Sequence, residues 1–215
     1  MKTLIITGGK LEDSFLLQFL EKESFEYVII VDGALEIANR VGLDFDCLVG
    51  DFDTVSKDVL AQYTSRKDIL IDQHMPEKDE TDTELAIHLA IEKKASHITI
   101  LGATGGRIDH LIGNIHLMKQ ALDASIPCVM VDVRNRIQLL NKATVFHKAS
   151  QYGTYISFLP YTDCATGICL IGFKYPLNDA ILTKGNTLGI SNEMVSNVCK
   201  LEMETGILIC IESCD

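Results

Sequence analysis

Short, almost continuous apolar runs alternate with amphipathic segments along the first part of the chain. Runs of this kind are typical of strands buried on both faces, and the segments between them are long enough for helices. In the segment 81–94, Thr81 and Glu84 have the spacing of a capping box, and apolar residues then recur at helical period. A further helix is expected over 109–122, with an apolar face formed by Leu111, Ile115, Met118 and Leu122. The pattern therefore predicts an α/β domain with a mainly parallel sheet covered by helices, its strands at 3–7, 27–31, 47–49, 69–71, 97–101 and 128–132.

The pattern changes after about Arg136. Alternating and β-branched runs follow one another, and Gly, Asn, Pro and Asp separate them at short intervals. No helical period is visible, which favours an all-β domain built as a sandwich or a barrel. The segment 203–208 is expected to be a hairpin turn that joins the last two strands. We place the two domains at 1–138 and 139–215, with strands of the second domain expected within 152–162, 166–175, 179–191, 199–206 and 207–212.

Composition and charge narrow the function classes. The 215 residues carry a formal net charge of −11, which argues against nucleic acid or an anionic membrane as a partner. The seven cysteines form no C-x-x-C pair, which argues against a zinc site and a disulfide framework. The first apolar run is too short for a signal peptide, and no run is long enough to span a membrane. A cytoplasmic protein with reduced thiols is expected.

Residues suited to chemistry follow the predicted strands. Parallel sheets bind ligands beyond the carboxyl ends of their strands, so the segments just after each strand are the places to look. Four of these segments carry acidic residues, and the last also carries glycines, an arginine and a histidine. The candidates are Asp32, Asp51, Asp53, Asp79, Asp82, Gly102, Gly105, Gly106, Arg107, Asp109 and His110.

These residue types together fit a metal and a phosphate. Mg²⁺ prefers oxygen ligands, and it is usually held by one or two carboxylates, water and substrate phosphates. Glycine-rich turns and helix N-termini bring backbone N–H groups close to phosphate, and an arginine such as Arg107 adds a bidentate donor. The combination predicts metal-assisted transfer from a nucleoside polyphosphate.

Each residue taken alone has an ordinary structural explanation. The D-x-D of Asp51 and Asp53 could be a solvated turn, whereas Asp79, Asp82 and Asp109 could cap or begin helices. A histidine such as His110 is more often structural than catalytic, and Gly102–Gly106 lacks the spacing and lysine of a P-loop. The joint occurrence of acidic residues at four strand ends nevertheless favours a cation and phosphate site.

Four stretches of the chain also carry a family resemblance. They are "VDGALEIANRVGLDFDCLVGDFDTV", "EKDETDTELAI", "LGATGGRIDHLIGNI" and, in the second half, "GFKYPLNDAILTKGNTLGISNE". In this order and spacing they resemble the thiamin pyrophosphokinase family. The resemblance covers nearly the whole chain. It implies an α/β nucleotide domain followed by a β-sandwich, and a homodimer with shared active sites. It also implies transfer of the pyrophosphoryl group of ATP to thiamin, which gives thiamin diphosphate and AMP.

The resemblance assigns roles to the candidate residues. It implies Mg²⁺ coordination by Asp51, Asp53 and Asp79, with Asp82 and Asp109 completing the catalytic carboxylates. Either Asp109 or Asp82 would accept the thiamin hydroxyl proton. The residues expected at the nucleotide are Asp32, Gly33, Gly105, Gly106, Arg107 and His110.

In the second domain, the resemblance places Ser191 and Asn192 at the thiamin ring. Without it, Ser191-Asn192-Glu193 would be interpreted as a polar turn.

Two other functions remain open. One is a Mg²⁺-dependent pyrophosphokinase or phosphotransferase acting on another small alcohol, and the other is a non-catalytic nucleotide-sensing module.

Overall fold

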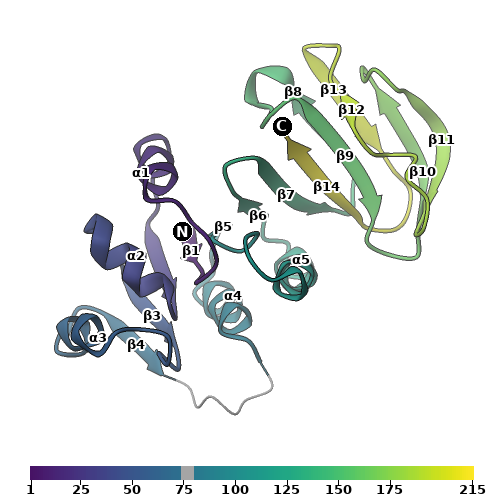
Figure 1. The fold of residues 1–215 in the computed structure, drawn as a ribbon. Coiled ribbons are helices and arrows are strands. Elements are labelled where there is room, and N and C mark those ends of the chain that lie inside the picture. The colour runs from purple at the N-terminus through teal and green to yellow at the C-terminus, as the bar shows by residue number, and fades with distance from the viewer. Residues whose placement is uncertain (74–79) are drawn as a thin grey trace. The chain divides into compact units, whose positions relative to one another are not determined.

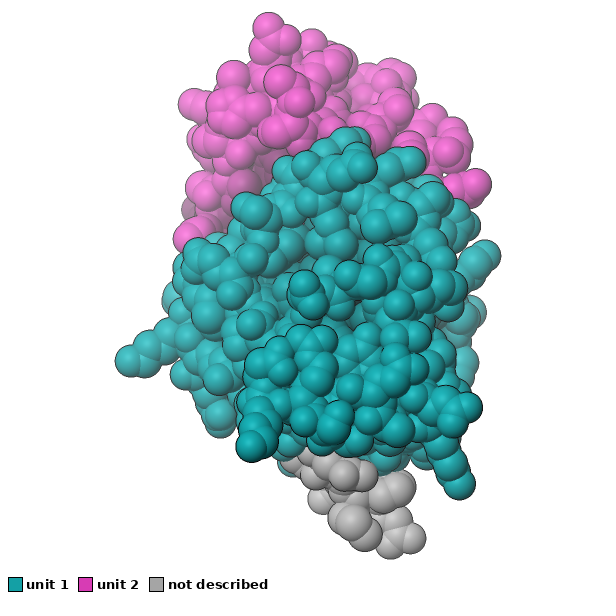
Figure 2. Space-filling model, turned by 90° about the vertical axis from the view of Figure 1, so that its left-hand side faces the viewer, with its two compact units in different colours: residues 1–133 teal, residues 134–215 magenta. Residues whose placement is uncertain are grey.

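A computed structural model describes residues 1–73 and 80–215 of the chain. The described residues form two compact units, Met1–Val133 and Arg134–Asp215 (Figure 2). The division falls before the boundary expected after residue 138, because the strand Asn135–Leu140 already pairs within the second unit.

The first unit contains a parallel sheet. Its strand order is β6-β5-β1-β2-β3-β4, and all of these neighbouring pairs are parallel. The α/β domain predicted from the apolar runs is therefore confirmed. The strands are β1 Lys2–Ile6, β2 Tyr27–Val31, β3 Cys47–Gly50, β4 Leu70–Gln73, β5 His97–Leu101 and β6 Cys128–Val131. The helices are α1 Asp13–Lys22, α2 Ala34–Val41, α3 Lys57–Thr64, α4 Asp82–Glu92 and α5 Ile108–Asp123.

The order of the strands reverses between β1 and β5. From β1 the chain proceeds through β2, β3 and β4 in one direction, and it then returns to add β5 and β6 on the other side of β1. Right-handed crossovers accordingly place α1, α2 and α3 on one face of the sheet and α4 and α5 on the other (Figure 1). At such a switch point the loops leaving the two neighbouring strands diverge and leave a crevice.

The helices predicted over 81–94 and 109–122 are both present, as α4 and α5. The packing of α5 differs from the prediction. Thr81 caps α4, and its side chain accepts a hydrogen bond from the N–H of Glu84 over 3.2 Å, as the capping-box spacing predicted. In α5 the fully buried residues are Asn114, Met118 and Ala121. Leu111, Ile115 and Leu122 are only half buried, so the helix turns a polar residue inward at position 114.

The second unit consists of two antiparallel sheets. One has the order β12-β9-β14-β7, and the other is a 4-stranded sheet with the order β11-β10-β13-β8. The strands are β7 Asn135–Leu140, β8 Thr144–His147, β9 Tyr155–Pro160, β10 Cys164–Ile171, β11 Leu177–Thr183, β12 Asn192–Glu193, β13 Val198–Glu202 and β14 Leu208–Ser213. A short 3-10 helix, Lys148–Ser150, follows β8.

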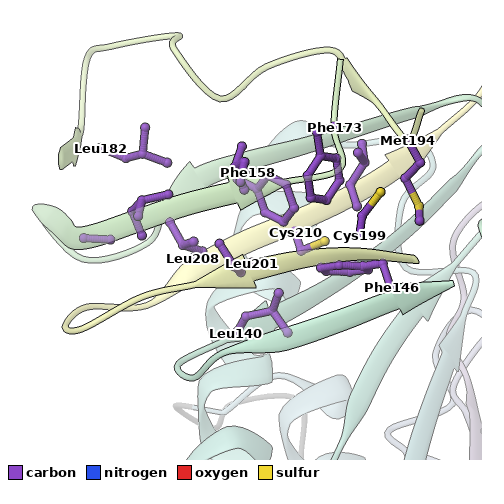
Figure 3. Close-up of a cluster of buried hydrophobic side chains, with 14 residues drawn as sticks. Leu140, Phe146, Phe158, Phe173, Leu182, Met194, Cys199, Leu201, Leu208 and Cys210 are labelled. Atoms are coloured by element: carbon purple, nitrogen blue, oxygen red, sulfur yellow. The ribbon is translucent and has the colours of Figure 1, made fainter. Parts of the chain in front are cut away.

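A hydrophobic core lies between these two sheets (Figure 3). Phe146, Phe158 and Phe173 meet edge to face at its centre, and the ring centroids of Phe158 and Phe173 are 5.8 Å apart. Both sheets contribute buried residues, among them Leu208 and Cys210 from one and Cys199 and Leu201 from the other. The expected β-sandwich is therefore confirmed.

The hairpin expected at 203–208 is wrong. β13 and β14 belong to different sheets, so the segment between them crosses from one sheet to the other. Thr205 forms an isolated antiparallel bridge with Thr166 on the way. Gly206 then adopts a φ of +93°, and a Cβ there would lie 2.6 Å from the carbonyl oxygen of Cys164. Gly206 therefore serves this crossing and not a hairpin turn.

All seven cysteines lie in the described part of the chain, and all are free. Burial raises the pKa of Cys128 to about 12, so this thiol stays protonated and behaves as a small apolar side chain. None of the helices within residues 1–73 and 80–215 is long and apolar enough to cross a membrane.

Candidate active site

A cavity of about 560 Å³ opens at the carboxyl ends of the parallel strands. It lies where the switch point of the sheet predicts a crevice, between the loops that follow β1 and β5. Its described lining consists of Thr7, Gly8, Gly9, Lys10, Val31, Asp32, Asp51, Glu80, Thr81, Asp82, Thr83, Gly102, Ala103, Gly105, Gly106, Arg107, His110 and Asn114.

Three carboxylates gather at the ends of β2 and β3. Asp32, Asp51 and Asp53 each offer an oxygen, and these oxygens lie within 4.8 Å of one another. The cluster forms because β2 pairs with β3 so that Val31 lies opposite Val49, which places the residues after both strands side by side. We call these three residues the acidic cluster.

The D-x-D segment owes its shape to the residue between the two aspartates. Phe52 has a φ of +63°, and its side chain is only 5% exposed. Turning Phe52 inward leaves Asp51 half buried and Asp53 exposed. The N–H of Asp53 donates to Oδ1 of Asp51 over 3.1 Å, so the turn is closed by one of its own carboxylates.

Two features of the acidic cluster fit a bound cation. Oδ2 of Asp32 accepts a hydrogen bond from the Thr54 hydroxyl over 2.7 Å, whereas its Oδ1 is buried and has no hydrogen-bond partner among the described residues. A buried carboxylate oxygen without a partner is costly unless a cation is present to use it. Gly50 also keeps the site open, since a Cβ there would lie 3.1 Å from the Cβ of Asp32.

The carboxylates repel one another. The pKa of Asp53 is raised, chiefly by the negative charge of Asp51 and further by burial and by the charges of Asp32 and Asp82. A divalent cation would reverse this effect, because it favours the ionised form of every carboxylate that faces it. The donor set is all oxygen, which suits Mg²⁺ better than a soft metal.

Two glycine loops also line the cavity. The loop Thr7–Lys10 follows β1, and the loop Gly102–Gly106 follows β5. Gly102 has a φ of +75°, and a Cβ there would lie 2.4 Å from the carbonyl oxygen of Thr7. The N–H of Thr7 donates to the carbonyl of Leu101 over 2.9 Å. The two loops therefore touch through their backbones, which leaves backbone groups close to the cavity.

An ion pair stands at the beginning of α5. Nε of Arg107 donates to Oδ1 of Asp109 over 3.1 Å, and a second bond joins Nη2 to Oδ2. The Arg107 guanidinium holds the pKa of Asp109 at about 2, and a hydrogen bond from the His110 N–H adds to this effect. Arg107 and His110 line the cavity, but Asp109 is absent from its described lining. Asn114, one turn beyond His110, donates to the carbonyl of Ala103 over 3.0 Å.

In the second unit, Ser191 and Asn192 have different environments. Ser191 is exposed with a φ of +56°, and its N–H donates to the hydroxyl of Ser157 over 3.0 Å. Asn192 is only 3% exposed. Its Oδ1 accepts from the N–H groups of Tyr175 and Glu193, and its Nδ2 donates to the carbonyl of Tyr175 over 2.7 Å. The Asn192 side chain therefore replaces a strand partner for the backbone of Tyr175.

The structure brings most of the predicted residues of the first unit together. Asp53 joins the site through the acidic cluster, whereas Gly33 is the N-cap residue of α2 and is absent from the described lining of the cavity. Asp79 lies outside the described residues. The predicted residues that line the cavity are Asp32, Asp51, Asp82, Gly102, Gly105, Gly106, Arg107 and His110.

Several lining residues were missed by the sequence interpretation. The loop Thr7–Lys10 carries the pair Gly8-Gly9 directly after the first strand, and this pair was the available signal. Glu80 stands beside the residues that were chosen. Asn114 could not be found, because it falls within the helical pattern and only the packing of α5 turns it inward.

The fold and the site define a two-domain protein, in which an α/β unit carries an acidic, glycine-walled cavity and a β-sandwich follows it. The model of the thiamin pyrophosphokinase catalytic domain matches residues 19–130, and that of the thiamin pyrophosphokinase vitamin B1 binding domain matches residues 142–208. This chain belongs to the thiamin pyrophosphokinase family.

Individual relatives agree with this assignment. The chain is 37% identical over 166 residues to a thiamine pyrophosphokinase of Bacillus subtilis, a match that covers 77% of each chain. The crystal structure of thiamine pyrophosphokinase from Bacillus subtilis is similar with a TM-score of 0.88 and 31% identity over 100% of both chains. That of a thiamin pyrophosphokinase from Geobacillus thermodenitrificans has a TM-score of 0.86 and 31% identity, covering 100% of this chain and 98% of the other.

Proposed function

We propose that this chain transfers the pyrophosphoryl group of ATP to thiamin, which gives thiamin diphosphate and AMP. The observation that carries the proposal is the acidic cluster at the edge of a glycine-walled cavity, in a chain of the thiamin pyrophosphokinase family. A carboxylate site beside a cavity for an anion is what a metal-bound nucleoside polyphosphate requires. The β-sandwich unit matches the family's vitamin B1 binding domain, which supports thiamin as the acceptor.

In this proposal Mg²⁺ is held by Asp51, Asp53 and Asp79, the three ligands expected from the resemblance, and also by Asp32. When bound, the ion neutralises charge on the phosphates of ATP. The unpartnered oxygen of Asp32 supports giving this residue a place among the ligands rather than only near the nucleotide. Gly105 and Gly106 let the chain pass close to the phosphates, and Arg107 binds phosphate oxygens once it leaves Asp109.

The reaction also needs a group that accepts a proton. The hydroxyethyl oxygen of thiamin attacks the β-phosphorus of ATP, the bond from that phosphorus to the bridging oxygen of the α-phosphate breaks, and AMP leaves. The hydroxyl proton passes to a carboxylate. We assign this role to Asp82, which lines the cavity, and not to Asp109, which is absent from the described lining and is paired with Arg107.

The thiamin contact is proposed for Ser191. Its exposed hydroxyl has no hydrogen-bond partner within the described part of the chain, so it is available to the aminopyrimidine ring. Asn192 was expected to share this role, but its amide is used by the backbone of Tyr175. We therefore propose that Asn192 positions the segment that carries Ser191.

We further propose a homodimer with shared active sites, in which the β-sandwich of one subunit supplies thiamin to the acidic cavity of its partner. The family resemblance supports this arrangement, and a two-fold axis would generate two equivalent sites. A cytoplasmic location is proposed as well, and the free cysteines support it.

The test of the proposed function is a product assay. The protein is incubated with ATP, Mg²⁺ and thiamin, and nucleotides and thiamin esters are separated and quantified. AMP and thiamin diphosphate should form in equal amounts, and omission of thiamin should abolish AMP formation. ADP with thiamin monophosphate would show an ordinary kinase. AMP formed only with another alcohol would favour a different acceptor, and nucleotide binding without any product would favour a sensing module.

A further inference from the structure

Lys10 is a cationic residue of the cavity that neither the motifs nor the proposed mechanism uses. It directly follows Gly8-Gly9 in the loop after β1, and it lines the cavity. Its side chain is exposed, and among the described residues its ammonium group has no hydrogen bond or ion pair. An unpaired ammonium at the wall of a cavity is available to a ligand.

The charges around the cavity show why this ammonium matters. The described lining contains the acidic residues Asp32, Asp51, Glu80 and Asp82. The lysines and arginines of that same lining are Lys10 and Arg107. Because Arg107 is already paired with Asp109, Lys10 contributes the unpaired positive charge there.

The backbone of Lys10 lies close to Gly105 in the loop that follows β5. A Cβ on Gly105 would lie 2.7 Å from the Cβ of Lys10 and 3.2 Å from both its N and O atoms. Because Gly105 has no side chain, the backbone of Lys10 can approach the glycine loop that follows β5 this closely. The flexible stem of the lysine thus starts beside the loop expected to bind phosphate.

We infer that Lys10 binds the phosphates of ATP that lie beyond the α-phosphate. A nucleoside triphosphate carries most of its charge on those phosphates, and a lysine is well suited to them as a mobile point charge. AMP lacks these phosphates and has to leave after the transfer, so a contact confined to them favours binding of ATP without retaining the product. The inference rests on the proposed function, because it takes ATP as the ligand of this cavity.

Binding measurements with matched variants test the inference. Lys10→Met removes the charge and keeps the length of the apolar stem, whereas Lys10→Arg keeps a cation. Lys67→Met is the control, since Lys67 is also exposed in the first unit and is absent from the described lining of the cavity. The affinity of each protein for ATP and for AMP is measured by calorimetry with Mg²⁺ present.

Lys10→Met should weaken ATP binding about ten-fold or more, the value expected for a lost charge-assisted hydrogen bond. The affinity of Lys10→Met for AMP should differ from that of the wild type by no more than about two-fold, which is the usual small effect of a surface substitution. Lys10→Arg should recover most of the ATP affinity, and Lys67→Met should match the wild type. In the proposed reaction, the KM for ATP should rise in Lys10→Met more than the KM for thiamin does.

Two outcomes would overturn the inference: unchanged ATP affinity in Lys10→Met, or an equal loss of affinity for ATP and AMP. Thermal unfolding of each variant would reveal a folding defect, and the recovery in Lys10→Arg separates the effect of charge from that of structure. A wild-type chain that binds ATP but forms no AMP would refute the proposed function alone, because Lys10 is judged on binding. A wild-type chain that fails to bind ATP would refute both.

Discussion

Gly9 lies against the carbonyl group of Gly102, so close that a Cβ on Gly9 would stand 2.1 Å from the carbonyl oxygen and 3.2 Å from the carbon. Neither group can move easily, because one belongs to the loop after β1 and the other to the loop after β5. The absence of a side chain at residue 9 is therefore what lets the two loops meet beside the cavity.

Gly9→Ala is expected to push these loops apart. Overpacking against backbone should lower the free energy of unfolding by about 1–3 kcal/mol and should weaken ATP binding, because both loops line the cavity. The control is Gly113→Ala, at a helical position where a Cβ meets nothing within 4 Å, and it should gain about 0.5–1 kcal/mol. Chemical denaturation of both variants makes the comparison, and equal stability would contradict the steric explanation.

Asp51→Asn is expected to remove most of the activity and keep the fold. The change takes one charge from the acidic cluster, and the remaining Oδ1 can still accept the hydrogen bond from Asp53. Activity should fall about 100-fold or more, as for loss of a metal ligand. Without metal, the variant should melt no lower than the wild type, because a repelling charge is gone.

The measurement for Asp51→Asn is thermal unfolding with and without Mg²⁺, beside a turnover assay. Mg²⁺ should raise the melting temperature of the wild type more than that of the variant. Asp44→Asn, at an exposed loop position of the same unit, controls for the change in net charge. Near-normal turnover of Asp51→Asn would refute its role in the acidic cluster.

We expect Asp82 to act as the general base and Asp109 to orient Arg107, so their variants should differ in kinetics. Asp82→Asn should lower kcat by about 10²–10⁴-fold, the usual contribution of a general base. Asp109→Asn should change kcat far less and act on ATP binding through Arg107, its partner in the ion pair. The pH profile of kcat/KM, which reports groups of the free enzyme, gives a second readout. If Asp109 were the base, kcat/KM should not fall on its account until the pH approaches about 2, because the pair with Arg107 keeps Asp109 ionised in the free enzyme down to that value.

Arg136 and Glu212 form an ion pair in the second unit, in which the carboxylate is buried and the guanidinium is half buried. Glu212 is only 1% exposed, and its Oε1 accepts from Nη2 of Arg136 over 2.6 Å while Oε2 accepts from the N–H of Tyr152 over 2.8 Å. Arg136→Met should cost about 3–5 kcal/mol, because it leaves a buried carboxylate without its cation. Lys184→Met, which breaks the exposed pair with Asp163, should have little effect on denaturation.

Shared active sites should be visible in mixed dimers. Asp51→Asn and Asn192→Ala subunits, each expected to be nearly inactive alone, are combined under conditions that exchange subunits. One site of a heterodimer then carries both changes and the other carries neither, so up to about half of wild-type activity per heterodimer should return. Heterodimers that are shown to form and remain inactive would exclude a shared site. Thermal unfolding of Asn192→Ala checks that the loss of its bonds to Tyr175 leaves the subunit folded.

The sequence by itself determined the elements and the chemistry they carry. Apolar runs such as Tyr27–Val31 and the capping residue Thr81 act locally, through burial and through a hydrogen bond three residues away, so their pattern is legible in the chain. The order of acidic residues also follows from the chain alone, because each one lies in the segment between a buried strand and the next helix or in the first turn of that helix. The division into an α/β domain and an all-β domain could be predicted as well, because the pattern of apolar and polar positions changes locally after about Arg136.

Only the tertiary structure decided which of these residues meet. Asp32 joins Asp51 because β2 pairs with β3 in one register, and Gly9 meets Gly102 because β1 pairs with β5 across more than half of the first unit. The tertiary structure also shows that the segment 203–208 crosses between two sheets and is not a hairpin. It likewise shows that the amide of Asn192 is hydrogen-bonded to Tyr175. Strand pairing and burial depend on contacts between residues far apart in the chain, and no local pattern of apolar and polar positions records them.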